Sequence, residues 1–389
     1  MNIIKKSSLA KVTTLAALMA ASSITIASQQ WPDLPEGIKN GVGVQVGSVV
    51  YVGLGSAGDS FYALDVEAKN PQWKKLADFE GSVPDGAAAA AADDKIYVLG
   101  GSGKVKSSDK APVVLDTVHA YDIKKNEWST VKTQTPVGML GASAYALNDK
   151  EIVILGGYNK DKFDKYLSDI LSIDQKKDPQ QWQTVVDDFM GMKPENYQWN
   201  KQIQIYNVAT NSWSVRGESP YLPNCGAALV GNGSEITLIS GEIKPGLRTP
   251  MVKSVTIKGE EVKWKELAQL PTPVGAELQE GVAGAYAGMS NGTLLVAGGA
   301  NFHGARAQSI RGQWFAHNGF AKAWNPEIYA YRNGGWQQTE TRLPEGLAYG
   351  ASFTTGKGML MVGGEGPDGK PRNDVYMINY NGTDVEIES

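Results

Sequence analysis

Three charged side chains that could carry out acid–base chemistry lie in one short segment. Residues 240–249 read Ser-Gly-Glu-Ile-Lys-Pro-Gly-Leu-Arg-Thr and contain Glu242, Lys244 and Arg248. Pro245 and Gly246 restrict and turn the chain, so the charges are held on a short loop. A carboxylate can act as a general base, and a guanidinium can bind an anion through two parallel hydrogen bonds. From spacing alone, a solvated surface turn explains the segment equally well.

Other common catalytic and metal-binding patterns are absent from the sequence. It has no P-loop, no dinucleotide fingerprint and no HExxH motif. Its three histidines, His119, His303 and His317, are scattered, and Cys225 is the single cysteine. This set predicts no structural zinc site, no internal disulfide and no copper site of the galactose oxidase type. We therefore expect neither a metal nor a cofactor.

A repeated pattern surrounds the charged segment. A clear copy has a short apolar run that ends in a glycine pair, and a tyrosine and a tryptophan usually follow; the weaker copies end in Gly53-Leu-Gly55 or Ser240-Gly241 instead. Four clear copies end at Gly101, Gly157, Gly299 and Gly364, and two weaker copies end at Gly55 and Gly241. The copies are about 45 to 85 residues apart, compatible with a kelch repeat of about 50 residues plus insertions. The pattern predicts an all-β fold, a six-bladed kelch-type β-propeller.

The beginning of the chain resembles the end of a repeat. Residues 31–37 read Trp-Pro-Asp-Leu-Pro-Glu-Gly, and residues 343–346, downstream of Trp336, read Leu-Pro-Glu-Gly. This similarity predicts that an N-terminal strand completes the last blade, which begins near Tyr349. Such closure would leave no free sheet edge between the first and last blades.

Two insertions interrupt the repeats, near residues 158–200 and 300–325. The first contains Tyr197 and other aromatic residues, and the second contains Arg306 and His317. Long ordered insertions in compact folds often serve as lids or binding loops. Surface decoration remains the alternative interpretation for both.

The N-terminus has the pattern of an export signal. Lys5, Lys6 and Lys11 precede an apolar stretch, and small residues near Ala27 or Ser28 suit cleavage. Residues 1–28 are therefore predicted to be a signal peptide, and residues 29–389 a single propeller. No segment is long and apolar enough to predict a membrane span. Cleavage changes the formal charge from −4 to −7, which gives no electrostatic case for nucleic-acid binding.

The charged segment also carries a family resemblance. Gly-Glu-x-Lys-Pro-Gly-Leu-Arg-Thr, at residues 241–249, resembles the signature of the N-acetylneuraminate epimerases, or sialic acid mutarotases. Residues 53–58, 297–304, 315–317 and 349–350 match the same family in order, so the resemblance covers essentially the whole mature chain. It implies a mutarotase for sialic acid, exported to the periplasm, that needs no cofactor. Nothing in the sequence specifies its oligomeric state.

The resemblance implies roles for individual residues. Glu242 aligns with the family's proton acceptor, and Arg248 would bind the substrate carboxylate. Lys244, Arg306, Tyr197, His317 and Tyr349 are further candidates for substrate binding. Tyr197, His317, Tyr349 and water are all possible donors of the proton to the ring oxygen.

Two other functions compete with this interpretation. A non-catalytic kelch module could bind a glycan or a protein and use Glu242 and Arg248 as a salt bridge. A sialidase would also use a six-bladed propeller and arginine recognition of a carboxylate. Sialidases usually carry repeated Ser-x-Asp-x-Gly-x-Thr-Trp boxes, and this sequence has none.

Overall fold

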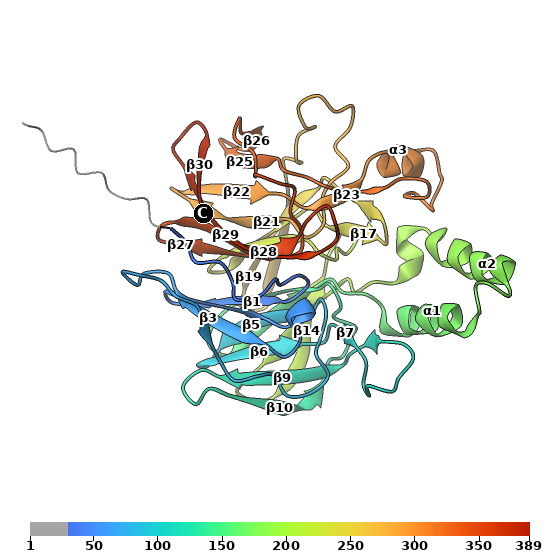
Figure 1. Cartoon of the computed structure of the whole chain (residues 1–389), viewed down its shortest axis with the longest axis horizontal. Coiled ribbons are helices and arrows are strands. Elements are labelled where there is room, and N and C mark those ends of the chain that lie inside the picture. Colours follow the sequence, from blue (N-terminus) through green and yellow to red (C-terminus); the bar gives the residue numbers. More distant parts are fainter. Residues whose placement is uncertain (1–29) are drawn as a thin grey trace, which may run out of the picture.

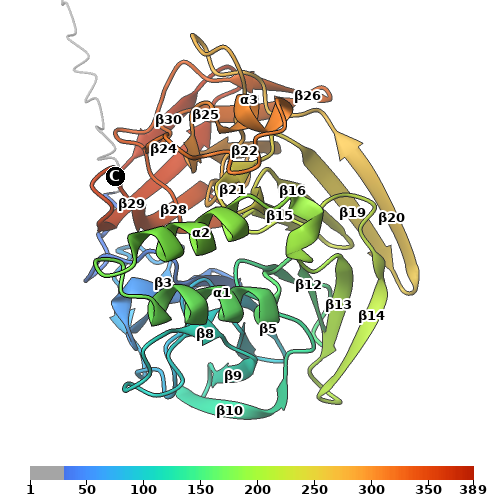
Figure 2. The same cartoon turned by 90° about the vertical axis from the view of Figure 1, so that its right-hand side faces the viewer.

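The computed structural model describes residues 30–389, and the predicted signal peptide lies outside the described residues. Six four-stranded antiparallel sheets form the blades of a β-propeller (Figures 1 and 2). Within residues 30–389, no helix combines the length and the apolar character needed to span a membrane. The sequence prediction of a six-bladed propeller is confirmed.

Each blade runs from an inner strand beside the propeller axis to an outer strand. The first three blades contain, in this order, β1 (Val42–Val46), β2 (Val49–Gly53), β3 (Phe61–Asp65) and β4 (Lys74–Lys75); β5 (Ala88–Ala92), β6 (Lys95–Leu99), β9 (Thr117–Asp122) and β10 (Glu127–Gln134); and β11 (Ser143–Ala146), β12 (Glu151–Leu155), β13 (Gln202–Asn207) and β14 (Ser212–Glu218).

The other three blades repeat this arrangement. They contain β15 (Ala228–Asn232), β16 (Glu235–Ile239), β19 (Val252–Lys258) and β20 (Glu261–Leu267); β21 (Tyr286–Ser290), β22 (Thr293–Ala297), β25 (Ile328–Arg332) and β26 (Gly335–Gln338); and β27 (Ala351–Thr355), β28 (Gly358–Glu365), β29 (Pro371–Tyr380) and β30 (Val385–Glu388). The second strand of each blade is the apolar run of the repeat and is largely buried, because neighbouring sheets cover both of its faces.

The insertions all leave a blade between its second and third strands, so they gather on one face of the ring. They contain η1 (Gly55–Ala57), β7 (Ser102–Gly103) and β8 (Val113–Val114); α1 (Lys160–Ser172), α2 (Pro179–Met190) and η2 (Pro194–Tyr197); β17 (Glu242–Lys244) and β18 (Leu247–Arg248); and β23 (Ala300–Phe302), α3 (Ala305–Ile310) and β24 (Lys322–Trp324). In Figure 2, α1 and α2 cross in front of the ring of blades.

Tryptophans of the outer strands fasten one blade to the one before it. The indole of Trp128 donates to the Ala77 carbonyl, Trp213 to the Thr133 hydroxyl and Trp336 to the Ala268 carbonyl. Each of these bonds joins consecutive blades. They give the tryptophan of the repeat a physical purpose, because a buried indole N–H needs an acceptor.

The closure of the ring differs from the prediction. The last blade takes all four of its strands, β27 to β30, from the C-terminal part of the chain, so no N-terminal strand completes it. Residues 31–38 instead form an irregular arm between the last and first blades. Pro32 and Pro35 lack the N–H donors that a ladder strand needs, and β30 already occupies the outer edge of the last blade.

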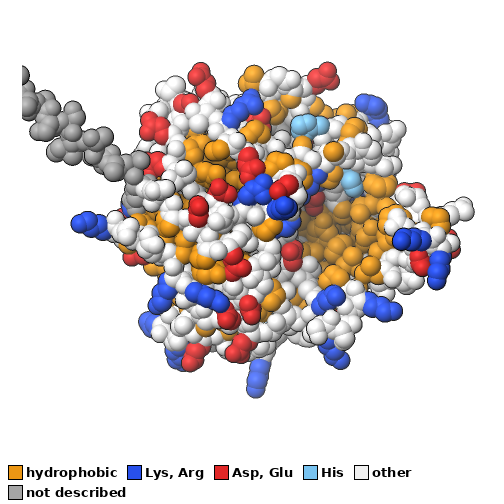
Figure 3. All heavy atoms as spheres, viewed as in Figure 1, with side chains coloured by type: hydrophobic (Ala, Val, Ile, Leu, Met, Phe, Trp, Pro, Cys, Tyr) orange, Lys and Arg blue, Asp and Glu red, His pale blue; other side chains and the backbone are white. Residues whose placement is uncertain are grey.

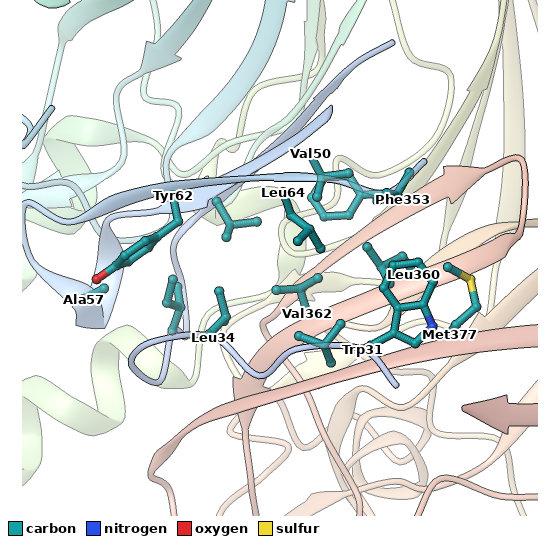
Figure 4. Packing of buried hydrophobic residues seen from close by; sticks show 14 residues of the cluster. Trp31, Leu34, Val50, Ala57, Tyr62, Leu64, Phe353, Leu360, Val362 and Met377 are labelled. Carbon is teal, nitrogen blue, oxygen red and sulfur yellow. The ribbon is translucent and has the colours of Figure 1, made fainter. Parts of the chain in front are cut away.

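The arm takes the place of an inter-blade linker. Trp31 and Leu34 pack against Val50 of the first blade and Val362 of the last (Figure 4). The Trp73 indole donates to the Pro32 carbonyl, the same kind of bond that Trp128, Trp213 and Trp336 make between other blades. Residues 31–37 resemble residues 343–346 because both are linkers between neighbouring blades. The N-terminal linker closes the ring.

A closed ring of six backbone hydrogen bonds surrounds the axis on the insertion side. The residue two positions before the start of each inner strand donates its N–H to the carbonyl of the equivalent residue in the neighbouring blade, at 2.8 to 2.9 Å. All six have positive φ, between 52° and 71°, and they are Asn40, Gly86, Gly141, Gly226, Gly284 and Tyr349. We call this set the axial ring.

Candidate active site

The repeat brings a particular sequence position to the face that carries the insertions. The residue that follows the last glycine of the repeat bridges to the residue before the axial ring, as in Cys225–Glu242 and Ala348–Glu365. Tyr158 follows the pair Gly156-Gly157 in the same way. Tyr158, Glu242 and Glu365 therefore occupy equivalent positions in three blades.

Glu242 and Arg248 face each other across the short hairpin β17–β18. Their Cα atoms are register partners, and Arg248 Nη1 lies 3.0 Å from Glu242 Oε1. Gly246 turns the hairpin at φ 78° and donates its N–H to the same oxygen at 3.4 Å. The side chain of Arg248 is 4% exposed and that of Glu242 is 17% exposed. The carboxylate therefore keeps access to solvent while the guanidinium beneath it is buried.

Arg248 is held from several directions. Its Nε donates to the Ala300 carbonyl at 3.1 Å, its Nη2 donates to the Tyr349 hydroxyl at 3.2 Å, and Phe302 covers the guanidinium at 5.0 Å. Nη1 is ion-paired with Glu242, but its N–H groups are not aligned on the carboxylate. Arg248 thus positions Glu242 and Tyr349 and retains N–H groups that can bind an anion.

Tyr158 completes the site, and the sequence analysis did not identify it. Its hydroxyl donates to Glu242 Oε2 at 3.1 Å, and its ring stacks on Trp199 at 4.4 Å. Burial, followed by the charge of Glu242, raises the pKa of Tyr158 well above the usual range. The phenol therefore remains a hydrogen-bond donor to Glu242. Its position directly after a glycine pair, equivalent to that of Glu242, is the signal that could have revealed it.

Lys244 has a different environment from the one expected of a substrate-binding residue. It is fully buried and donates to the carbonyls of Met190 and Trp314, and the Tyr197 ring lies 5.4 Å from its ammonium. Burial lowers the pKa of Lys244 to about 8. The two carbonyls belong to the two long insertions, so Lys244 ties the hairpin of Glu242 to both of them.

Tyr197 and His317 lie near Lys244. The Tyr197 hydroxyl donates to the Phe189 carbonyl within an aromatic cluster of the first insertion. Burial, with smaller contributions from Lys244 and Arg248, lowers the pKa of His317 to about 4, so its imidazole is neutral at pH 7. The buried Nδ1 of His317 has no hydrogen-bond partner among residues 30–389 and lies directly against Gly246.

Arg306 is bound to a segment outside its own insertion. Its Nη1 donates to the Gln279 carbonyl at 2.9 Å, and its backbone N–H donates to Glu280 at 2.8 Å. These contacts anchor α3 to the segment that precedes β21. Of the predicted site residues, Arg248 contacts both Glu242 and Tyr349. Lys244 and Tyr197 have partners in the insertions, and Arg306 has its partners in the segment before β21.

A second charged cluster lies beside Tyr349. Glu365 is buried between the ammonium groups of Lys39, at 2.5 Å, and Lys322, and it also accepts from the Trp324 indole at 3.1 Å. Burial alone would raise the pKa of Glu365, but the hydrogen bonds from Lys322 and Lys39 outweigh it and lower the pKa. Lys322 also lies 4.5 Å from the centre of the Tyr349 ring.

The insertions border a recess on this face. In Figure 3, hydrophobic side chains line a hollow between the blades and the α1–α2 insertion, next to a central group of acidic and basic side chains. Aromatic side chains in a hollow bind the apolar faces of a ligand, and charged groups select its polar parts.

The fold and the site define a six-bladed propeller that carries an acid–base site of one carboxylate, one guanidinium and two phenols. A family model for N-acetylneuraminate epimerases matches residues 31–387. An N-acetylneuraminate epimerase of Vibrio vulnificus is 53% identical over 374 residues, 95% of this chain and 97% of that protein. One of Brucella melitensis is 48% identical, covering 96% and 97% of the two chains.

A solved structure supports the same relationship. The structure of YjhT is 35% identical to this chain and has a TM-score of 0.85, covering 92% of this chain and 99% of that one. The chain belongs to the N-acetylneuraminate epimerase family.

Proposed function

We propose that this protein interconverts the α and β anomers of N-acetylneuraminic acid. The observation that carries the proposal is the contact between Glu242 and Arg248, with a phenol on each of them, in a chain of this family. The relatives are named as enzymes, which does not favour a binding module without activity.

The chemistry of the substrate matches these groups. Sialic acid is a cyclic hemiketal with a carboxylate on its anomeric carbon. Glu242 accepts the proton of the anomeric hydroxyl as the bond to the ring oxygen breaks and a ketone forms. Rotation about a carbon–carbon bond presents the other face of the ketone, and the ring closes as the protons return. Atoms and charge balance without an oxidant or a reductant.

Arg248 has two tasks in this proposal. It holds the Glu242 carboxylate at the hairpin, and its remaining N–H groups bind the carboxylate of the substrate. A neutral sugar would lack this second interaction. A buried guanidinium discriminates strongly, because leaving its hydrogen bonds unmade costs about 1–3 kcal/mol for each group.

We further infer that the protein is exported and works in the periplasm after cleavage near Ala27 or Ser28. The charged and apolar pattern of residues 1–28 supports this inference. We also infer that the repeats are of the kelch type. The glycine pairs and the tryptophan bonds between blades support this assignment.

Proton NMR of freshly generated α-N-acetylneuraminic acid tests the activity. We expect the mature protein to produce the β anomer much faster than buffer alone, and Glu242→Gln to lose at least about 100-fold of that acceleration. Binding of the sugar to Glu242→Gln, measured by calorimetry, should persist. A wild-type rate equal to the buffer rate would refute the proposal for this sugar, and a fully active Glu242→Gln would remove Glu242 from the mechanism.

A further inference from the structure

Tyr349 occupies a backbone position that a large side chain rarely adopts. It belongs to the axial ring, whose other five members are four glycines and Asn40, and its φ is 63°. A bulky residue in this region costs on the order of 1–3 kcal/mol, and such strain is concentrated at functional sites. Its backbone hydrogen bonds to Gly284 and Asn40 maintain the conformation.

The neighbouring member of the axial ring leaves space for the tyrosine. A Cβ atom on Gly284 would lie 2.3 Å from Tyr349 Cδ1, closer than any non-bonded contact. The side chain is therefore fixed in a slot between two blades. Its hydroxyl reaches Arg248 Nη2 at 3.2 Å, on the nitrogen next to the one that pairs with Glu242.

The two phenols of the site differ in where their protons point. Tyr158 donates its proton to Glu242. Tyr349 accepts from Arg248, which has no acceptor atom, so its own proton is directed elsewhere. Among residues 30–389, no group accepts a hydrogen bond from the Tyr349 hydroxyl. Its proton is thus available to a ligand.

A lysine ammonium lies over the aromatic ring of Tyr349. The Lys322 ammonium lies 4.5 Å from the ring centre and 4.7 Å from that of Trp324, and Glu365 holds it in place. Together, Arg248 and Lys322 put two positive charges beside the phenol. Arg248 stabilises negative charge as it develops on the Tyr349 oxygen, whereas the carboxylates of Glu242 and Glu365 oppose it. Lys322, which lies over the ring and pairs with Glu365, offsets part of that opposition.

We propose that Tyr349 is a second catalytic residue, the acid that protonates the ring oxygen while Glu242 accepts the anomeric proton, and that Lys322 is its positioning residue. This inference rests on the proposed function. In ring opening, the Tyr349 proton moves to the ring oxygen and leaves a phenolate beside Arg248. In ring closure, the new hydroxyl returns its proton to the phenolate, and protonated Glu242 returns its proton to the carbonyl oxygen.

The other candidate donors suit this step less well. The Tyr197 proton is bound to the Phe189 carbonyl. His317 is neutral at pH 7, and a neutral imidazole is a weak acid. Burial raises the pKa of Tyr349, with Arg248 opposing the rise, so this phenol is fully protonated at neutral pH.

Substitution of each phenol separates their roles. Tyr349→Phe keeps the ring, its slot and the contact with Lys322, so we expect a folded protein whose kcat falls by about 100-fold or more with little change in KM. Tyr158→Phe removes a hydrogen bond to Glu242 but leaves the Tyr349 hydroxyl in place, so we expect a smaller fall in kcat than in Tyr349→Phe. Wild-type kcat in Tyr349→Phe would overturn the inference while leaving the proposed function intact.

A tyrosine analogue with a more acidic phenol gives a second readout. With 3,5-difluorotyrosine at position 349, the basic limb of the kcat–pH profile, corrected for the buffer reaction, should move to lower pH than in the wild type. The same analogue at position 158 should leave the basic limb in place. A purely structural Tyr349 would give no shift, and that result would overturn its role as an acid.

Lys39 supplies a matched control for Lys322, since both pair with Glu365 but only Lys322 contacts the Tyr349 ring. We expect Lys322→Gln to lower kcat several-fold and move the basic limb to higher pH, because the phenol loses a stabilising cation. Lys322→Arg should restore much of the rate. Equal effects of Lys322→Gln and Lys39→Gln would remove the positioning role.

Discussion

Two blades place a glutamate directly after the last glycine of the repeat, Gly241 or Gly364, and an arginine a few residues later, yet the two turns differ in chemistry. In the fourth blade, Glu242 pairs with Arg248 within the same hairpin and keeps one face open. In the sixth blade, Glu365 is enclosed by Lys39 and Lys322, and Arg372 turns away to Glu345 and Asp368.

The repeat places both glutamates at the same position of a blade, and the side chains around each glutamate determine what it can do chemically. Glu365 has two ammonium partners and an indole donor, which lower its pKa and make it a poor proton acceptor. Glu242 has one buried guanidinium and one phenol. Glu365 is enclosed by its partners, whereas the Glu242 side chain is 17% exposed and can be approached by a substrate hydroxyl.

The largest expected difference is between the same substitution in the two turns. Glu242→Gln removes the proposed base and should lower kcat by at least about 100-fold. Glu365→Gln keeps a hydrogen-bonding side chain between the lysines and should lower kcat by less than about tenfold, with a measurable loss of thermal stability because a buried ion pair is broken. NMR anomer-exchange rates and thermal unfolding measure both. Equal losses of rate would mean that the two turns do not differ in the way described.

The lysines of the two turns offer the next comparison. Lys244 is buried with two carbonyl partners, while Lys370 is exposed. The folded-state pKa of Lys244 is about 8, below its ordinary value of 10.5. Between these values the unfolded chain binds a proton that the folded chain does not, so this group makes stability rise with pH.

Substitution by methionine isolates that contribution. The free energy of unfolding of the wild type minus that of Lys244→Met should increase from pH 8 to pH 10.5, by at most about 1.4 kcal/mol per pH unit. Lys370→Met should show no such slope. At pH 7, Lys244→Met should also lower kcat several-fold, because the hairpin loses its tie to both insertions. A difference that stays flat with pH would show that Lys244 does not change its pKa on folding.

The sequence predicted the parts of this molecule that depend on local pattern. Apolar runs and glycine pairs indicated six blades, and the dense charges of residues 240–249 indicated Glu242 and Arg248. What it did not predict depends on contacts between distant segments. Tyr158 meets Glu242 84 residues away, and Lys39 meets Glu365 326 residues away. The composition and spacing within either segment do not specify the partner in the other.

Two other differences between the sequence prediction and the structure also arise from contacts between distant segments. Lys244 looks in sequence like an exposed turn residue, but the carbonyls of two insertions remove it from solvent. The proline-containing residues 31–37 resemble the end of a repeat, and they serve as the linker between the last and first blades rather than as a strand. An alignment of the repeats would have shown that Tyr158 and Glu242 occupy equivalent positions, because each directly follows the last glycine of its repeat, Gly157 or Gly241.

The smallest effect we expect comes from the glycines at the tips of the two turns. Gly246 and Gly369 have similar φ, 78° and 73°. A Cβ on Gly246 would lie 1.8 Å from His317 Nδ1, whereas a Cβ on Gly369 would have no neighbour within 4 Å. Alanine at either position has the same backbone cost of about 1 kcal/mol. The difference between the two variants in free energy of unfolding therefore reports the contact with His317.

We therefore expect Gly246→Ala to lower the free energy of unfolding by about 1–3 kcal/mol more than Gly369→Ala, as overpacking does in a filled core. Thermal or denaturant unfolding measures this difference. Because the imidazole must move to admit the methyl group, Gly246→Ala should also reduce kcat modestly. Replacing His317 with alanine in the Gly246→Ala background should recover the stability lost to the clash. If it does not, the cost of Gly246→Ala lies in the hairpin backbone, and the two turns are alike at their tips.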